Sequence, residues 1–338
     1  MSEPLATATA PAAAAPGEPE IAPARRFDPD RIRSLGIVFP FLALFVVLSI
    51  TSSAFLTSTN LLDILDQQSS TLVVAAAGTL VLVAGGIDLS VGATYSLASV
   101  TAGHFALESG AGLAVIMGIG VGALVGLVNG LIVTVLRINA LITTLAMFFV
   151  VGGVASLVTD GNLITLFNKQ GFGNIAQSSF LGVRTSIWIM LVPVILLGLM
   201  LARSTIGRYV YAVGGNAQAA RLAGVRVDAV RVLTFVLSGT MAGLAGVIDT
   251  SRVLSAAAST QDTNTLAFTV IGGIVVGGTS ILGGDGAVWR TIVGILFIAM
   301  IGNGYILLGL DPLYQQITLG VLMIAAVSLD VWSRRQRG

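Results

Sequence analysis

Long apolar runs separated by short polar segments fill the chain from residue 35 to residue 332. Each run is close to the roughly 20 residues that a transmembrane helix requires. The pattern predicts an all-α polytopic membrane protein of about ten transmembrane helices. The runs lie at about 35–56, 69–87, 89–106, 112–136, 140–159, 185–202, 230–250, 266–284, 288–310 and 313–332. Those at 89–106 and 266–284 are short and interrupted by glycine, which favours broken or re-entrant helices over full crossings.

Polar sequence flanks this transmembrane domain on both sides. Residues 1–34 open with Ala, Pro, Thr and Glu in no apolar period, so we expect a disordered cytoplasmic tail. The first apolar run is longer than that of a cleavable signal peptide, which favours an uncleaved first helix. Residues 333–338 form a short basic tail that we also expect in the cytoplasm.

The basic residues predict which ends of the helices face the cytoplasm, because cytoplasmic loops of membrane proteins are enriched in Arg and Lys. Alternate threading of ten spans from an inside amino terminus leaves only Lys169, Arg184 and Arg252 outside. It places inside Arg25, Arg26, Arg31, Arg33, Arg137, Arg290, the five arginines of 203–231 and the arginines of the tail. This bias predicts that both termini are cytoplasmic.

Composition agrees with a membrane protein and excludes several chemistries. The chain is 55% hydrophobic and 10% charged, with a mean hydropathy of +0.95, far from an ordinary soluble domain. A net charge of +1 gives no bulk attraction to nucleic acid. With no cysteine and only His104 as histidine, the chain has little to offer a metal site or a catalytic triad. We therefore expect neither a metal nor an enzymatic activity.

The glycines do not form a nucleotide-binding loop. The chain has 41 glycines, and many lie inside apolar runs, as at Gly118, Gly120, Gly122 and Gly126. Small residues within membrane helices allow neighbouring helices to approach closely, so we interpret them as packing positions. The phosphate-binding pattern ending in Gly-Lys-Ser/Thr is absent, since Lys169 is the only lysine. This chain should not hydrolyse ATP itself.

The segment 203–231, here called the polar loop, holds five of the sixteen arginines of the chain. Within it the run from Asn216 to Gly224 predicts a short helix, capped by Asn216 and ended by Gly224. One interpretation is a docking element for a soluble partner. The other is a solvated loop whose arginines only fix the topology.

Two glycine-rich breaks, at 85–92 and 277–286, each interrupt an apolar run with an acid. A charge at the bilayer centre costs roughly 2.5–3.5 kcal/mol, so Asp88 should lie near an interface or have hydrogen-bond donors nearby. Structurally, Gly85 and Gly86 can end one helix while Asp88 caps the next. Functionally, broken helices expose polar backbone along a permeation path. Asn129 and Asn303 could bind a hydroxylated solute, although hydrogen bonds between helices are commoner for asparagine in membranes; Gln315 and Gln316 are equally ambiguous.

Three ordered motifs resemble the ribose-type permease subunits of bacterial ABC sugar importers. They are Gly-Gly-Ile-Asp-Leu-Ser-Val-Gly at 85–92, Gly-Arg-Tyr-Val-Tyr-Ala-Val-Gly-Gly-Asn at 207–216, and Gly-Gly-Thr-Ser at 277–280 followed by Gly283-Gly284. The resemblance extends from about residue 61 to residue 330. It implies an inner-membrane permease that works with a second permease copy, cytoplasmic ATPase subunits that bind the ATP, and a periplasmic sugar-binding protein.

The resemblance also gives the motifs roles. In such importers a short cytoplasmic helix of the permease docks into the ATPase, which favours the docking interpretation of the polar loop. The residues expected to couple to the ATPase are Gly207, Arg208, Asn216, Ala219, Ala220, Arg221, Leu222, Ala223 and Gly224. Those expected at the translocation path or its helix breaks are Gly85, Gly86, Asp88, Ser90, Asn129, Gly277, Gly278, Ser280 and Asn303.

The chain departs from the family pattern before and within the second break. Relatives usually have Glu-Leu-Asp where this chain has Ala-Phe-Thr at 267–269, an Arg where it has Asp285, and a small residue where it has Arg290. We expect these changes around a gate or an outward-facing helix, which leaves open the substrate and a heterodimeric pairing. We expect a non-catalytic permease that carries a monosaccharide or polyol by alternating access. The alternative is an ion-coupled secondary transporter using Asp88 or Asp249.

Overall fold

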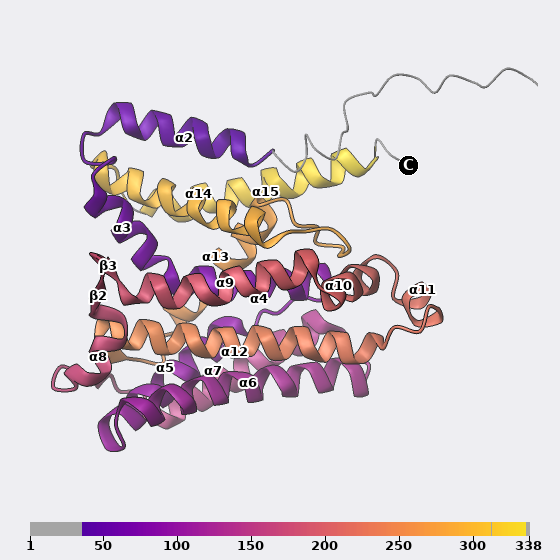
Figure 1. The fold of residues 1–338 in the computed structure, drawn as a ribbon, viewed down its shortest axis with the longest axis horizontal. Coiled ribbons are helices and arrows are strands. Elements are labelled where there is room, and N and C mark those ends of the chain that lie inside the picture. Colours follow the sequence, from indigo (N-terminus) through magenta and orange to yellow (C-terminus); the bar gives the residue numbers. More distant parts are fainter. Residues whose placement is uncertain (1–35, 312, 336–338) are drawn as a thin grey trace, which may run out of the picture.

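The computed structural model describes residues 36–311 and 313–335 of the chain (Figure 1). The predicted tail 1–34 and residues 336–338 of the basic tail lie outside these ranges. The described helices are α2 (Val38–Thr51), α3 (Ser58–Gln67), α4 (Ser69–Val83), α5 (Val91–Glu108), α6 (Ala111–Val135), α7 (Ala140–Thr159), α8 (Gln170–Gln177), α9 (Thr185–Arg203), α10 (Thr205–Gly215), α11 (Ala217–Leu222), α12 (Val227–Val253), α13 (Thr260–Val276), α14 (Val288–Leu307) and α15 (Leu313–Arg335).

Every predicted apolar run contains a helix, so the all-α polytopic prediction is confirmed. Five helices, α6, α7, α9, α12 and α14, are long and apolar enough to cross a membrane. The single first span expected at 35–56 is wrong in detail, because α2 ends at Thr51 and the separate helix α3 follows. The run expected at 266–284 is also misplaced, since α13 begins earlier and ends before Gly277.

Helix α12 lies at the centre of the bundle, packed against α6, α5 and α4 (Figure 1). Glycines make the closest of these contacts possible. A Cβ on Gly122 would lie 2.3 Å from the carbonyl oxygen of Gly239, and one on Gly126 would lie 2.2 Å from that of Phe235. The prediction of packing glycines is confirmed at these positions, whereas a Cβ on Gly120 would meet no atom within 4 Å.

The two ends of the bundle differ. One end, which we call the α11 end, carries α10 and α11 and lies on the right in Figure 1. The opposite end, which we call the strand end, carries α8 and two short antiparallel ladders: β1 (Ile164–Thr165) with β4 (Ser255–Ala256), and β2 (Ser179–Phe180) with β3 (Val183–Arg184). Between the ends, large apolar side chains such as Ile142 and Phe149 are exposed, as expected for helices that face lipid.

Candidate functional site

The three motifs that carry the resemblance meet at the α11 end of the bundle. The amide of Gly284 donates a 2.9 Å hydrogen bond to the carbonyl oxygen of Val83. A Cβ on Gly214, in α10, would lie 1.7 Å from that same oxygen, and one on Gly283 would lie 2.9 Å from the Cα of Gly85. Segments that are far apart in the sequence therefore touch through backbone alone, at positions where only glycine fits.

The second break also holds an ion pair beside α10. Arg290 contacts Asp285 at 2.7 Å, and Tyr211 of α10 donates a 2.6 Å hydrogen bond to the carbonyl oxygen of Gly286. Burial raises the pKa of Tyr211 above its ordinary value of 10.0, so the hydroxyl stays protonated and donates. Asp285 and Arg290 thus lie at the α11 end with the polar loop. The expectation that they lie around a gate or an outward-facing helix stays a prediction, and the ion pair places both residues at the second break.

The first break buries a carboxylate inside the bundle. Asp88 accepts hydrogen bonds from the amide of Ser90 at 3.0 Å, from its hydroxyl at 2.6 Å and from the hydroxyl of Ser238 on α12 at 2.8 Å. Asn129 of α6 donates to the Ser90 hydroxyl at 2.7 Å. The expectation of donors around Asp88 is confirmed. They join α12, α6 and the start of α5, so the break is held by side chains that replace water.

Replacing Asp88 with alanine should therefore lower the thermal stability of the protein. The change leaves the Ser90 amide and two hydroxyls without their acceptor, at a cost of about 1–3 kcal/mol per unsatisfied buried group. Thermal unfolding of the purified protein measures it. Asp63→Ala on α3 is the matched control, and equal midpoints for the two variants would contradict a structural role for the Asp88 cluster.

The predicted short helix of the polar loop is present as α11. Asn216 caps it, its side-chain oxygen accepting from the amide of Ala219 at 2.9 Å. Gly224 follows it with a φ of +85°, the left-handed conformation that favours glycine. Both predicted ends are confirmed. The expected small docking face is wrong at one position, because Ala220 is only 6% exposed and packs into the core, whereas Leu222 is 90% exposed.

Arg208 and Arg221, the two arginines expected to couple to the ATPase, already have partners in this chain. Arg221 contacts Asp228 at 3.3 Å, and Arg137 contacts the same carboxylate at 2.9 Å. Arg208 donates to the hydroxyl of Thr205 at 2.9 Å. These exposed contacts fix the loop to the starts of α12 and α10.

A cavity of about 540 Å³ lies between α3, α4, α5, α12, α13, α14 and α15. Twelve of its 19 lining residues have polar side chains, which is unusual between membrane helices, where polar side chains mark solute pathways. The polar residues that line it are Gln67, Gln68, Ser70, Thr71, Tyr95, Asp249, Arg252, Thr265, Thr269, Asn303, Gln315 and Gln316.

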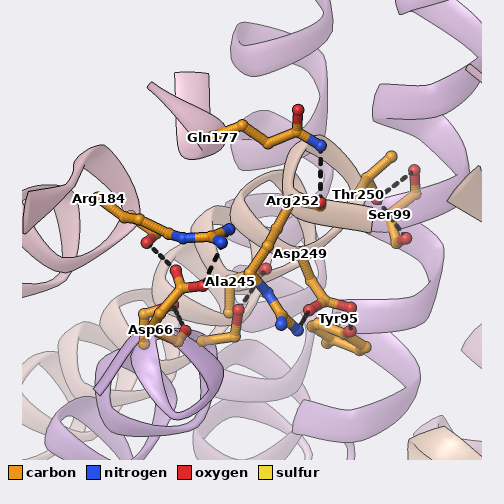
Figure 2. Close-up of polar contacts among 12 residues, drawn as sticks. Asp66, Tyr95, Ser99, Gln177, Arg184, Ala245, Asp249, Thr250 and Arg252 are labelled. Atoms are coloured by element: carbon orange, nitrogen blue, oxygen red, sulfur yellow. Dashed lines mark hydrogen bonds and ion pairs between the residues drawn. The ribbon is translucent and has the colours of Figure 1, made fainter. Parts of the chain in front are cut away.

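Two ion pairs stand close together beside this cavity, as Figure 2 shows. On α12, Asp249 is paired with Arg252 and accepts a hydrogen bond from the hydroxyl of Tyr95. Next to it, Arg184 lies 3.5 Å from Asp66, which also accepts from Ser186. Each carboxylate therefore has a guanidinium partner, which offsets part of the cost of burying the charge.

Of the residues expected at the translocation path, Asn303 alone lines this cavity. It also exchanges hydrogen bonds with Asn60 of α3, at 2.8 and 3.2 Å. Asn303 therefore joins two helices, which is the commoner role of asparagine in membrane proteins. Gly85 and Gly86 line a smaller cavity of about 230 Å³ at the α11 end. Residues 277–280 belong to the second break, whose Gly284 donates to the carbonyl oxygen of Val83 at the first break. Four further polar residues of the lining were not expected at the path: Gln67, Gln68, Tyr95 and Arg252. Of these, Tyr95 lies within a predicted apolar run, whereas Gln67, Gln68 and Arg252 lie just beyond the ends of such runs.

The fold and these sites define a polytopic transport protein rather than an enzyme. Residues 60–327 match the family described as the branched-chain amino acid transport system permease component, and the chain belongs to this family. It is a multi-pass inner-membrane permease subunit of an ABC importer. ATP hydrolysis in such importers belongs to a separate subunit, and a substrate-binding protein is a further component. No solved structure gives a significant match.

Curated relatives agree with the motif resemblance. The ribose import permease protein RbsC of Bacillus subtilis is 39% identical over 296 residues, covering 86% of this chain and 91% of the relative. RbsC of Escherichia coli K12 is 38% identical over 293 residues, with the same coverage. The L-arabinose ABC transporter permease protein AraH of Azospirillum brasilense is 35% identical over 312 residues, covering 90% of each chain. The resemblance to ribose-type permeases is confirmed.

Proposed function

We propose that this chain forms half of the translocation path for a ribose-like monosaccharide or a polyol, in an ATP-driven importer that works by alternating access. The relatives named for ribose and L-arabinose import support the substrate class. The polar cavity supports a path for an uncharged hydrophilic solute. ATP binds to the partner subunit, and this chain carries no cofactor of its own.

The proposed assembly contains two permease copies, identical or different, in a lipid bilayer. The cytoplasmic ATPase docks at the α11 end, and the periplasmic sugar-binding protein delivers sugar at the strand end. We place ten crossings in each permease, with the tails 1–34 and 333–338 in the cytoplasm. Arginine distribution supports this orientation. At the α11 end lie Arg137, Arg203, Arg208, Arg221, Arg226, Arg231 and Arg290, against Lys169, Arg184 and Arg252 at the strand end.

The observation that carries the docking proposal is α11, a capped helix outside the bundle with Leu222 almost fully exposed. A lone exposed leucine is unremarkable on a helix that faces lipid, but α11 stands in the polar loop among five arginines. The contact of α10 with Val83 and Gly284 gives this region a direct mechanical link to both helix breaks. We propose that the breaks at 85–92 and 277–286 are the joints that move when the ATPase displaces α10 and α11.

Co-purification and transport test this function. Tagged protein expressed with its partner subunits should bring down an ABC ATPase. Vesicles containing the complex, with binding protein outside and ATP inside, should accumulate a sugar from a panel of pentoses, hexoses and polyols. The absence of an ATPase, or of transport of every sugar in the panel, would overturn the proposal.

The comparisons give no support to an ion-coupled transporter. Its two candidate ion sites are also occupied by other contacts, because Asp88 accepts three hydrogen bonds and Asp249 is paired with Arg252. Uptake that survived loss of the ATPase and collapsed with an uncoupler would be the result that favours it.

A further inference from the structure

We infer that the 540 Å³ cavity is a binding site of the permease itself for an uncharged polyhydroxylated solute, with the Asp249–Arg252 pair as its main recognition element. This inference rests on the proposed function and deepens it. The permease would then select its cargo directly rather than serve only as a passage for what the binding protein releases.

The amides of the lining provide hydrogen-bonding capacity that the fold does not use. Among the residues whose side chains the structure describes, Gln67, Gln68, Gln315 and Gln316 make no side-chain hydrogen bond within the chain, although all four line the cavity. Each primary amide can donate two hydrogen bonds and accept two. Because a sugar hydroxyl is both a donor and an acceptor, each amide can bind it through either its NH₂ group or its oxygen.

The Asp249–Arg252 pair adds the stronger contacts. Each carboxylate oxygen of Asp249 accepts one bond from this chain, from Tyr95 and from Arg252, and each has a second lone pair. Arg252 also lines the cavity, with its guanidinium beside the carboxylate of Asp249. One acceptor and one donor with charge therefore stand side by side, an arrangement suited to the vicinal hydroxyls of a sugar or polyol.

Charge balance predicts selection for neutral cargo. Asp249 is compensated by Arg252, and nearby Asp66 by Arg184, so the cavity carries no uncompensated charge in either pair (Figure 2). A phosphate or carboxylate on the solute would compete with Asp249 or Asp66 for the guanidinium group that each is paired with. Its charge would also lose water in the cavity without gaining an unpaired cation. An uncharged solute avoids both the competition and the loss of hydration of a charge.

Size and the apolar part of the lining fit the same class. The volume lies within the range of about 300–1,000 Å³ for small-molecule sites. Apolar side chains complete the wall, among them Leu266, Ile298 and Leu319, and they can cover the C–H faces of a sugar ring. The apolar and polar lining thus matches the two kinds of surface that a polyol presents.

Cysteine protection tests binding directly, because the natural chain has no cysteine. In the purified complex, Gln68→Cys should react with a water-soluble thiosulfonate, and excess D-ribose, L-arabinose or ribitol should slow that reaction several-fold. Ribose 5-phosphate should not slow it. Gln170→Cys, on the exposed start of α8 away from the cavity, is the matched control and should react at one rate throughout.

Transport variants supply the second measurement. Gln315→Leu should reduce sugar uptake about fivefold, equivalent to one hydrogen bond of about 1 kcal/mol, while Val150→Leu, on the exposed apolar side of α7, has no effect. Asp249→Asn should reduce it about ten- to a hundredfold, as expected for contacts to a charged group. Wild-type transport with no protection at Gln68→Cys and full activity of Gln315→Leu would overturn this inference alone. Absence of wild-type transport would instead overturn the proposed function.

Discussion

Replacing Gly214 with alanine should prevent the complex from assembling in a stable form. The added Cβ would lie 1.7 Å from the carbonyl oxygen of Val83 and 2.7 Å from the amide nitrogen of Gly284. Those two atoms are joined by a hydrogen bond, so neither can move without breaking the contact between the two breaks. Overpacking typically costs about 1–3 kcal/mol and occasionally more. Here the obstacle is backbone, so we expect the upper part of that range or beyond.

Gly215→Ala is the matched control, because a Cβ there would meet no atom within 4 Å. The two variants differ by one position in α10 and carry the same added methyl group. Thermal unfolding of the purified permease, together with the amount of ATPase that co-purifies, should separate them clearly. Equal stability and equal recovery of the ATPase would mean that the three motifs do not depend on their contact at Gly214.

Sequence patterns were sufficient for the elements that depend on local physics. The lengths of the apolar runs predicted where most of the helices lie, because in lipid a helix must pair its own backbone N–H and C=O groups. The asparagine and glycine that bracket α11 could be assigned because caps act within a few residues. Gly122 and Gly126 of α6 could be assigned to packing because a mid-helix glycine in a membrane span has few other roles, although the same reasoning fails for Gly120.

Features that depend on pairing between distant segments could not be predicted in this way. No local signal shows that residues near 85, 214 and 284 touch, or that Asp88 finds its third donor at Ser238, 150 residues away. The cavity is assembled from seven helices, so its lining is dispersed through segments that lie far apart in the sequence. Ala220 was expected on a docking face because its residue type suits one. Which side of a short helix packs inward is set by the tertiary contacts.

Replacing Leu222 with glutamate should uncouple ATP hydrolysis from sugar uptake while leaving the permease folded. Leu222 is 90% exposed at the end of α11, so its replacement should disturb little of the packing among the described residues. If α11 enters a cleft of the ATPase, this side chain is its largest apolar contact, and a carboxylate there would have to be desolvated. Loss of a hot-spot contact at the centre of an interface costs about 2 kcal/mol or more. We expect uptake to fall at least about tenfold, with ATPase activity no longer stimulated by sugar-loaded binding protein.

Gln218→Glu is the control for this variant, because it adds the same carboxylate to an exposed position of the same helix. It should retain most of the coupling if the contact is centred on Leu222. Ala220 is a poorer test, since a large side chain there would strain the packing of α11 against the core and would confound folding with docking. Unfolding midpoints for Leu222→Glu and Gln218→Glu should match the wild type. If Leu222→Glu has normal stability, normal sugar uptake and normal stimulation of ATPase activity, the ATPase contact lies elsewhere in the polar loop. The exposed arginines Arg203 and Arg226 would then be the next positions to test.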